Sequence, residues 1–109
     1  MASLLILYMI AGLVMVGLAI PLALEKIGPN PFYGFRVTKT LNDKRIWYLA
    51  NSYAGFRLIA AGLVIVIGAA ILYCLPGLKL ETYAITLFVL VLTCVITVLA
   101  QSFWYLSKL

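Results

Sequence analysis

"FRLIAAGLVIVIGAAILYCLPGLKLETYAITLFVLVLTCVITVLAQSFWY", residues 56–105, decides the fold of this chain. Two predominantly apolar runs, 56–75 and 82–105, are separated only by "PGLKLE", in which Pro76-Gly77 ends the first run. About 20 apolar residues in a helix cross the hydrocarbon core of a bilayer. Helices joined by so short a connection are antiparallel neighbours. The stretch therefore predicts a hairpin of two transmembrane helices.

A third apolar run precedes this hairpin. Residues 2–24 contain no charged side chain and are long enough to span a membrane. A signal peptide would need a basic first part and a shorter apolar part, and this run has neither. The whole chain is 66% hydrophobic and 10% charged, whereas a soluble domain carries about 25% charged residues. We expect an all-α integral membrane protein, one three-span domain over residues 1–109.

Basic residues predict the orientation of the spans. Lys79 alone lies in the short turn, and Lys108 follows the third span. The other Lys and Arg lie between the first span and the start of the second: Lys26, Arg36, Lys39, Lys44, Arg45 and Arg57. The positive-inside rule places the long loop and the C-terminus in the cytoplasm and the N-terminus outside. Because the charges flank membrane spans, the net charge of +5 does not indicate a nucleic-acid partner.

Small and polar residues recur at helical spacing within the second and third spans. Seven-residue and four-residue spacings place side chains on one helix face, and small residues allow two helix backbones to approach closely. We interpret these positions as helix packing, and a polar path through the membrane is the alternative. They are Gly55, Gly62 and Ala69 in the second span and Thr86, Thr93, Thr97 and Gln101 in the third.

Residues for catalysis or metal binding are scarce. The chain has no His, and its acids are Glu25, Asp43 and Glu81, none paired with a base. Cys74 and Cys94 lie in apolar runs at different predicted depths, so they have neither metal-ligand spacing nor a disulfide geometry. We expect no enzyme activity, no metal and no cofactor.

Polar chemistry is concentrated in "PNPFYGFRVTKTLNDKRIWYLAN", residues 29–51. Its prolines favour extended backbone at Gly28 and Asn30, and Gly34 is a turn residue. This predicts a structured cytoplasmic loop. A short amphipathic helix is expected from Leu41 or Asn42, capped by Thr40 or Asn42 and able to run into the second span.

Three side chains of this segment need partners. Trp47 and Asn51 share a helix face, and the loop backbone is the expected partner of the Asn51 amide. Arg36 presents a fork of donors that suits a lipid phosphate, a peptide carboxylate or Glu25. The alternative is a structural role, in which Arg36 binds carbonyl groups at the end of a helix.

The same segment resembles the signature of the SdpI family of small bacterial integral membrane proteins. The resemblance covers about residues 20–75, with the signature loop at 28–55, and the third span matches only in kind. The matching pattern is Asn30-Pro31-x-Tyr33-Gly34-Phe35-Arg36, then Thr38-x-Thr40-Leu41, Asn42 or Asp43, Trp47 and Asn51. By this pattern the signature positions are Asn30, Pro31, Tyr33, Gly34, Arg36, Thr40, Trp47 and Asn51.

The resemblance implies a non-enzymatic protein of the bacterial inner membrane that gives immunity to a secreted, membrane-active peptide toxin. The namesake of the family protects a Bacillus producer in this way and also holds a soluble repressor at the membrane, but it is longer by an additional hydrophobic half. The implied partners are membrane lipids, a peptide toxin, and a protein partner or further copies of the chain. Two other functions remain open: an accessory subunit of a larger membrane complex, and an oligomeric transporter or lipid-handling protein.

Overall fold

The structure is a computed structural model that describes residues 1–109, and it is all-helical. Its helices are α1 (Ala2–Ala23), α2 (Thr38–Leu41), α3 (Lys44–Tyr73) and α4 (Leu80–Ser107). Three of them, α1, α3 and α4, are long and apolar enough to cross a membrane. The prediction of an all-α chain with three membrane-spanning helices is confirmed.

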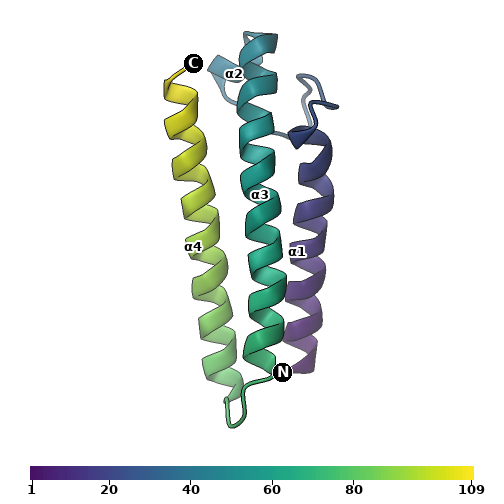
Figure 1. Cartoon of the computed structure of the whole chain (residues 1–109), viewed down its shortest axis with the longest axis vertical. Helices are drawn as coiled ribbons and strands as arrows, with labels where there is room; N and C mark the ends of the chain where they lie inside the picture. Colours follow the sequence, from purple (N-terminus) through teal and green to yellow (C-terminus); the bar gives the residue numbers. More distant parts are fainter.

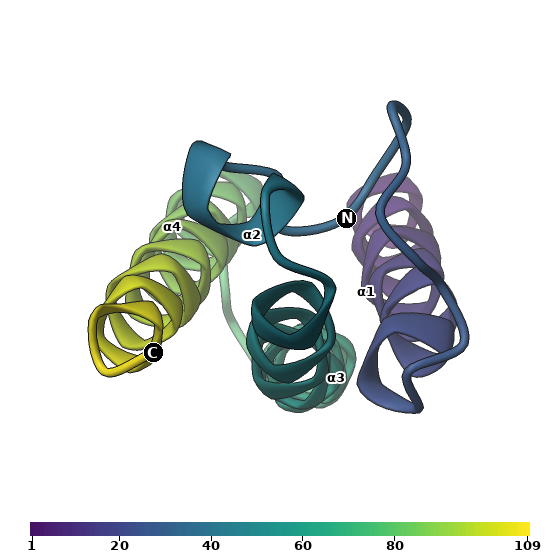
Figure 2. The same cartoon turned by 90° about the horizontal axis from the view of Figure 1, so that it is seen from above.

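The three long helices lie side by side along the long axis of a molecule measuring 52 × 22 × 18 Å, with α3 between α1 and α4 (Figures 1 and 2). Residues 24–43, the polar loop, connect α1 to α3 and contain α2. The polar loop and the C-terminus lie at one end of the bundle, the loop end. Residues 74–79 and the N-terminus lie at the other, the turn end (Figure 1).

Helix α3 joins two elements that the sequence predicted separately. It runs without a break from Lys44 to Tyr73, so the predicted amphipathic helix is its first part. The predicted start at Leu41 or Asn42 is wrong, because Asp43 caps α3: its Oδ1 accepts hydrogen bonds from the amides of Arg45 at 2.9 Å and Ile46 at 3.4 Å. At 1.5 Å per residue, 30 residues span about 45 Å. This exceeds the hydrocarbon core of about 30 Å, so α3 carries its first turns into the interface.

Glycines bring the backbones of α1 and α3 into contact. A Cβ atom on Gly62 would lie 2.7 Å from the carbonyl oxygen of Gly12, and one on Gly55 would lie 2.7 Å from the amide nitrogen of Ala23. No side chain larger than hydrogen fits at these positions without moving a helix. The predicted small-residue face of the second span thus faces α1.

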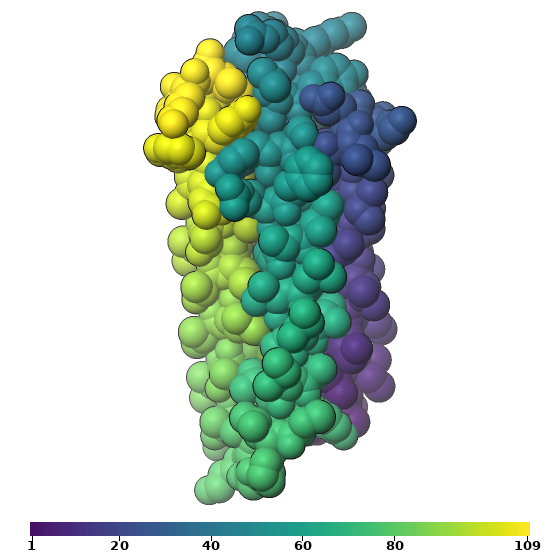
Figure 3. Space-filling view, in the orientation of Figure 1, coloured from purple at the N-terminus to yellow at the C-terminus, as the bar shows by residue number.

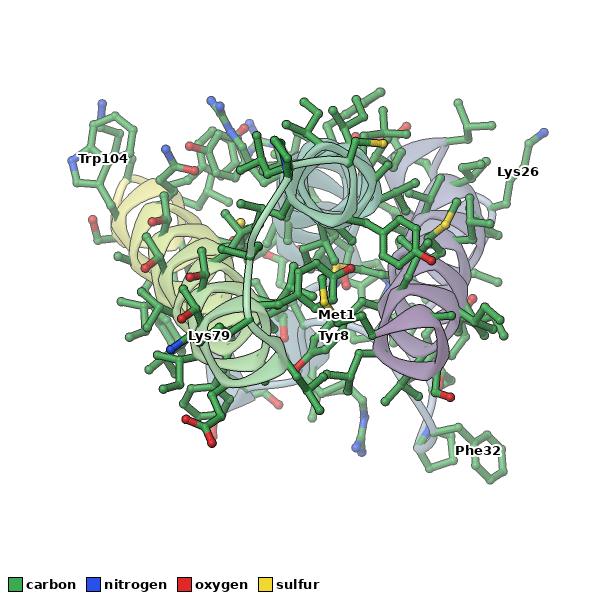
Figure 4. The ribbon with its side chains drawn as sticks, turned by 90° about the horizontal axis from the view of Figure 1, so that it is seen from below. Met1, Tyr8, Lys26, Phe32, Lys79 and Trp104 are labelled. Carbon is green, nitrogen blue, oxygen red and sulfur yellow. The ribbon has the colours of Figure 1, made fainter.

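At the turn end a small core joins all three long helices. Ala69, Tyr83 and Leu87 are fully buried there, and the Tyr83 hydroxyl donates a hydrogen bond to the Ala69 carbonyl at 3.0 Å. Met1, which precedes α1, and Tyr8 of α1 pack against this cluster, and Figure 4 shows both side chains pointing toward the middle of the bundle.

The polar stripe of the third span does not pack within the chain. Thr86, Thr93 and Thr97 are exposed on α4, Gln101 is half-buried, and the Thr97 hydroxyl donates to the Thr93 carbonyl of its own helix at 2.7 Å. The threonines are thus not part of the buried packing of this bundle, and their assignment to helix packing stays a prediction. Because consecutive residues point about 100° apart around a helix, the exposed threonines and the buried residues of α4 lie on different faces. The buried face of α4 consists of Tyr83, Leu87, Val98, Ser102 and Leu106.

Most of the molecule's apolar surface remains uncovered. Only 19 of 109 residues are buried, and large aliphatic side chains are exposed along each long helix. Figure 3 shows one such face, formed by α1, α3 and α4 together. Lipid is the environment that such a surface needs. Cys74 and Cys94 are both free, and Cys74 is exposed.

Candidate functional site

Asn30 organises the first turn of the polar loop. Its Oδ1 accepts hydrogen bonds from the amides of Phe32 at 2.8 Å and Tyr33 at 2.9 Å, and its Nδ2 donates to the Gly28 carbonyl at 2.9 Å. A side chain that bonds to its own neighbouring backbone in this way fixes a turn. Pro31 is exposed within the turn, and Phe32 is 87% exposed and points away from the bundle (Figure 4).

Asn51 connects the polar loop to α3. Its Oδ1 accepts from the Phe35 amide at 2.6 Å, and its Nδ2 donates to the Trp47 carbonyl at 3.0 Å, with the Phe35 carbonyl at 3.5 Å. The Asn51 side chain is buried. The loop backbone is thus the partner expected for this amide, because a buried amide without a partner costs about 1–3 kcal/mol.

Trp47 is an internal contact rather than a membrane-interface residue. It is 0% exposed, and its Nε1 donates to the Ile27 carbonyl at 2.8 Å. Gly34 lies directly against it, since a Cβ there would be 2.9 Å from Trp47 Cη2 and 2.9 Å from Asn51 Oδ1. Gly34 also has φ +121°, a conformation that side chains with a Cβ rarely adopt. The residue between Tyr33 and Phe35 therefore has to be glycine.

Thr40 closes the second half of the loop. Its hydroxyl accepts from the Val37 amide at 3.0 Å and donates to the Phe35 carbonyl at 2.7 Å, and its side chain is fully buried. Lys39, on the exposed side of α2, donates to the Leu106 carbonyl at 2.8 Å and so connects the loop to the end of α4. Lysine near the last turn of a helix satisfies carbonyl groups that lack an intrahelical partner.

Arg36 is exposed at the edge of the loop. Its Nε donates to the Asn30 carbonyl at 2.7 Å. This partner lies inside the same loop, and it is neither Glu25 nor a carbonyl at the end of a helix. The bond uses one of the five donors of the guanidinium group and leaves its two terminal nitrogens free for another acceptor.

Beneath the polar loop lies a groove of about 430 Å³, lined by 17 residues of which 13 are hydrophobic. Met15, Leu18 and Leu22 of α1 form one wall, and Val95 and Leu99 of α4 form the other. The floor is α3, and Tyr33, Gly34, Phe35, Arg36 and Val37 of the polar loop cover the loop end. Viewed along the bundle, α1 and α4 lie on opposite sides of α3 and the polar loop bridges the space between them (Figure 2).

One polar atom of the groove lacks a partner. Ser102 of α4 lines the groove and is 3% exposed, and its hydroxyl makes no hydrogen bond. Serine in a membrane helix ordinarily bonds to its own backbone or to a neighbouring helix. No acidic residue lines the groove, so Arg36 gives it a positive charge.

The structure thus brings the predicted signature positions together, and four of them, Tyr33, Gly34, Arg36 and Asn51, line the groove. The sequence did not single out Ser102, or Ser52, whose hydroxyl donates to the Ala23 carbonyl at the end of α1 at 2.8 Å. Both are ordinary small polar residues in an apolar helix. Their roles depend on which neighbour they face, and no spacing rule reports this.

The chain is similar to known proteins over most of its length. The model of the SdpI/YfhL protein family matches residues 26–102, which include nearly all of the polar loop, α3 and most of α4. The match thus extends beyond the resemblance into the third span. The chain is also 35% identical, over 68 residues, to the "Uncharacterized protein YfhL" of Bacillus subtilis (strain 168). The aligned region covers 62% of this chain and 56% of that protein. The chain therefore spans little more than half the length of this relative. No solved structure matches the chain.

Proposed function

We propose, from the premise that this chain belongs to the SdpI/YfhL protein family, that it protects a cell from a secreted, membrane-active peptide toxin. The observation that carries the proposal is the concentration of the signature residues in the polar loop and in the first turns of α3 that it covers. Four side chains form hydrogen bonds with backbone groups of the polar loop: Asn30, Thr40, Trp47 and Asn51. The loop that these bonds fix places Arg36 at the edge of the groove.

This arrangement suits binding rather than catalysis. The hydrogen bonds inside the loop fix the backbone before any ligand arrives, which lowers the entropy cost of binding. The groove offers apolar contact and a single exposed guanidinium group. We propose that these features intercept the toxin, or alter its access to the membrane, at the loop end.

We further propose that the chain lies in the bacterial cytoplasmic membrane with the polar loop and C-terminus in the cytoplasm. The basic residues support this orientation, because Lys26, Arg36, Lys39 and Lys44 lie at or beside the loop end and Lys79 lies at the turn end. Loops rich in Lys and Arg remain on the cytoplasmic side.

A survival experiment tests the proposed function. The chain is expressed in bacteria sensitive to the secreted peptide toxin of the family's Bacillus namesake, and growth is measured across toxin concentrations. The intact chain is expected to raise the toxin concentration needed to stop growth, and Arg36→Ala is expected to remove most of this protection at equal abundance in the membrane.

Arg57→Ala is the matched control. Arg57 is also exposed, but it lies on α3 with its guanidinium 4.9 Å from the centre of the Tyr53 ring, and it does not line the groove. It is expected to keep the protection. If the intact chain gives none, the proposed function is wrong. If Arg36→Ala protects fully, the role of the loop in it is wrong.

A second candidate is an accessory subunit of a larger membrane complex. The exposed face of α4 with Thr86, Thr93 and Thr97 favours it, because small polar side chains are typical of contacts between membrane helices. Purification from native membranes under mild conditions would then yield a larger partner in fixed stoichiometry. Recovery of the chain alone, or only with copies of itself, would contradict this role.

A further inference from the structure

We propose that the groove binds one acyl chain of an anionic phospholipid from the surrounding membrane, with the headgroup phosphate at Arg36. This inference is independent of toxin resistance, since it depends only on the groove and its polar atoms. Three features carry it: the dimensions of the groove, the free donors of Arg36, and the unpartnered Ser102 hydroxyl.

The groove is an apolar slot that runs along α4 from the loop end. From Phe103 to Val95 it follows α4 for eight residues, about 12 Å at 1.5 Å per residue. The core of Ala69, Tyr83 and Leu87 lies farther along, toward the turn end. A slot of this length, apolar on both walls and charged at one end, suits the acyl chain and headgroup of a lipid.

The loop end of the groove suits an anion. Arg36 is exposed and lines this end, and its Nε already bonds to the Asn30 carbonyl, which fixes the direction of the group. The remaining guanidinium donors match two phosphate oxygens at once. No carboxylate lines the groove to neutralise this charge. Basic residues beside a membrane span attract anionic headgroups.

Ser102 supplies a second polar contact, at the depth where a phospholipid has its ester carbonyl group. It precedes Phe103, whose ring contacts the Phe35 ring of the polar loop at 5.0 Å between centroids, so it lies just below the loop. Its hydroxyl is a buried donor without an acceptor. In a phospholipid the ester carbonyl lies between the phosphate and the acyl chain, and it accepts hydrogen bonds without carrying charge. Along the groove, Arg36 is followed by Ser102 and then by the apolar walls. In a phospholipid the phosphate is followed by the ester and then by the acyl chain, so the two orders match.

Native mass spectrometry of the purified full chain tests this assignment. The protein is transferred from nanodiscs that contain equal amounts of phosphatidylglycerol and phosphatidylcholine, and the retained lipids are counted. One phosphatidylglycerol per chain is expected, retained about tenfold more than phosphatidylcholine, because the choline cation of the second lipid offsets the charge of its phosphate at Arg36. Arg36→Gln is expected to remove this preference, and Arg57→Gln is expected to keep it.

Two further variants separate binding from folding. Val95→Trp places a large ring in the slot from a half-exposed position of α4 and is expected to lower retention of both lipids while leaving the helical circular dichroism unchanged. Ser102→Ala is expected to weaken retention of phosphatidylglycerol severalfold, whereas a merely structural Ser102 would leave it unchanged. Equal retention of the two lipids by the intact chain, an unchanged preference in Arg36→Gln, or lipid-free dimers would each overturn the proposal.

Discussion

At the scale of the residue, Trp47 shows how a side chain typical of membrane interfaces serves inside a small bundle. The indole is fully buried, and its N–H reaches the carbonyl of Ile27 across 20 residues of sequence. The polar loop folds over this ring instead of leaving it in the headgroup region. The other tryptophan, Trp104, is 56% exposed and keeps the ordinary role of a belt residue.

Trp47→Phe is expected to lower stability more than Trp104→Phe. The first change leaves the Ile27 carbonyl without its partner and opens a space beside Gly34, at a cost of about 1–3 kcal/mol. The second changes an exposed ring and is expected to cost less than about 0.5 kcal/mol. Thermal unfolding in the same detergent measures both, and equal melting temperatures would contradict the role assigned to the Trp47 N–H.

Gly34→Ala is expected to destabilise the polar loop by about 1–3 kcal/mol through backbone strain and a clash with Trp47 and Asn51. Gly77→Ala is the matched control, because Gly77 also has a positive φ, of +75°, but nothing lies within 4 Å of its Cβ position. The difference between the two melting temperatures reports the clash together with the greater strain at the larger φ of Gly34. If Gly77→Ala is as harmful as Gly34→Ala, strain alone explains both.

At the scale of the element, the contact between α1 and α3 depends on backbone approach. Gly62→Ala is expected to separate the two helices and to lower stability by about 1–3 kcal/mol, because its Cβ would lie 2.7 Å from the Gly12 carbonyl. Gly17→Ala meets nothing within 4 Å and is expected to be neutral or stabilising by about 0.5–1 kcal/mol. Unfolding in rising concentrations of sodium dodecyl sulfate compares them. Loss of stability in Gly17→Ala alone would contradict the close contact at Gly62.

The elements differ in how far the sequence predicted them. Long apolar runs gave the three spans, because the length of such a run is itself the physical requirement for crossing a membrane. The start of α3 was missed, since Thr40, Asn42 and Asp43 are all good caps and only the course of the loop decides among them. The outward direction of Thr93 and Thr97 was not predicted, because spacing defines a stripe but not the direction it faces.

The candidate site was predicted only in part, because spacing along the chain does not show which residues of different elements meet. The motif identified Arg36 and Asn51, and the need of a buried amide for a partner correctly indicated the loop backbone. The groove is formed by residues of α1, the polar loop, α3 and α4, and Ser102 acquires its character only from that assembly. Spacing along one helix carries no information about such a set.

At the scale of the whole molecule, the charge distribution predicts which end faces the cytoplasm. In a variant with Cys74 and Cys94 replaced by Ala, Lys79→Cys is expected to react with a membrane-impermeant maleimide in intact cells. Lys44→Cys is expected to react only after the cells are permeabilised. Reaction of Lys44→Cys in intact cells, with Lys79→Cys protected, would reverse the orientation.

The bond between Lys39 and Leu106 also sets an order of events during synthesis. The two residues lie 67 positions apart, whereas Phe35 and Asn51 lie 16 apart and Ile27 and Trp47 lie 20 apart. The shorter-range bonds therefore need only α3 and the polar loop, whereas the bond to Leu106 needs the last turn of α4. The second wall of the groove arrives with α4, so a nascent chain has no complete site until its last helix has entered the bilayer.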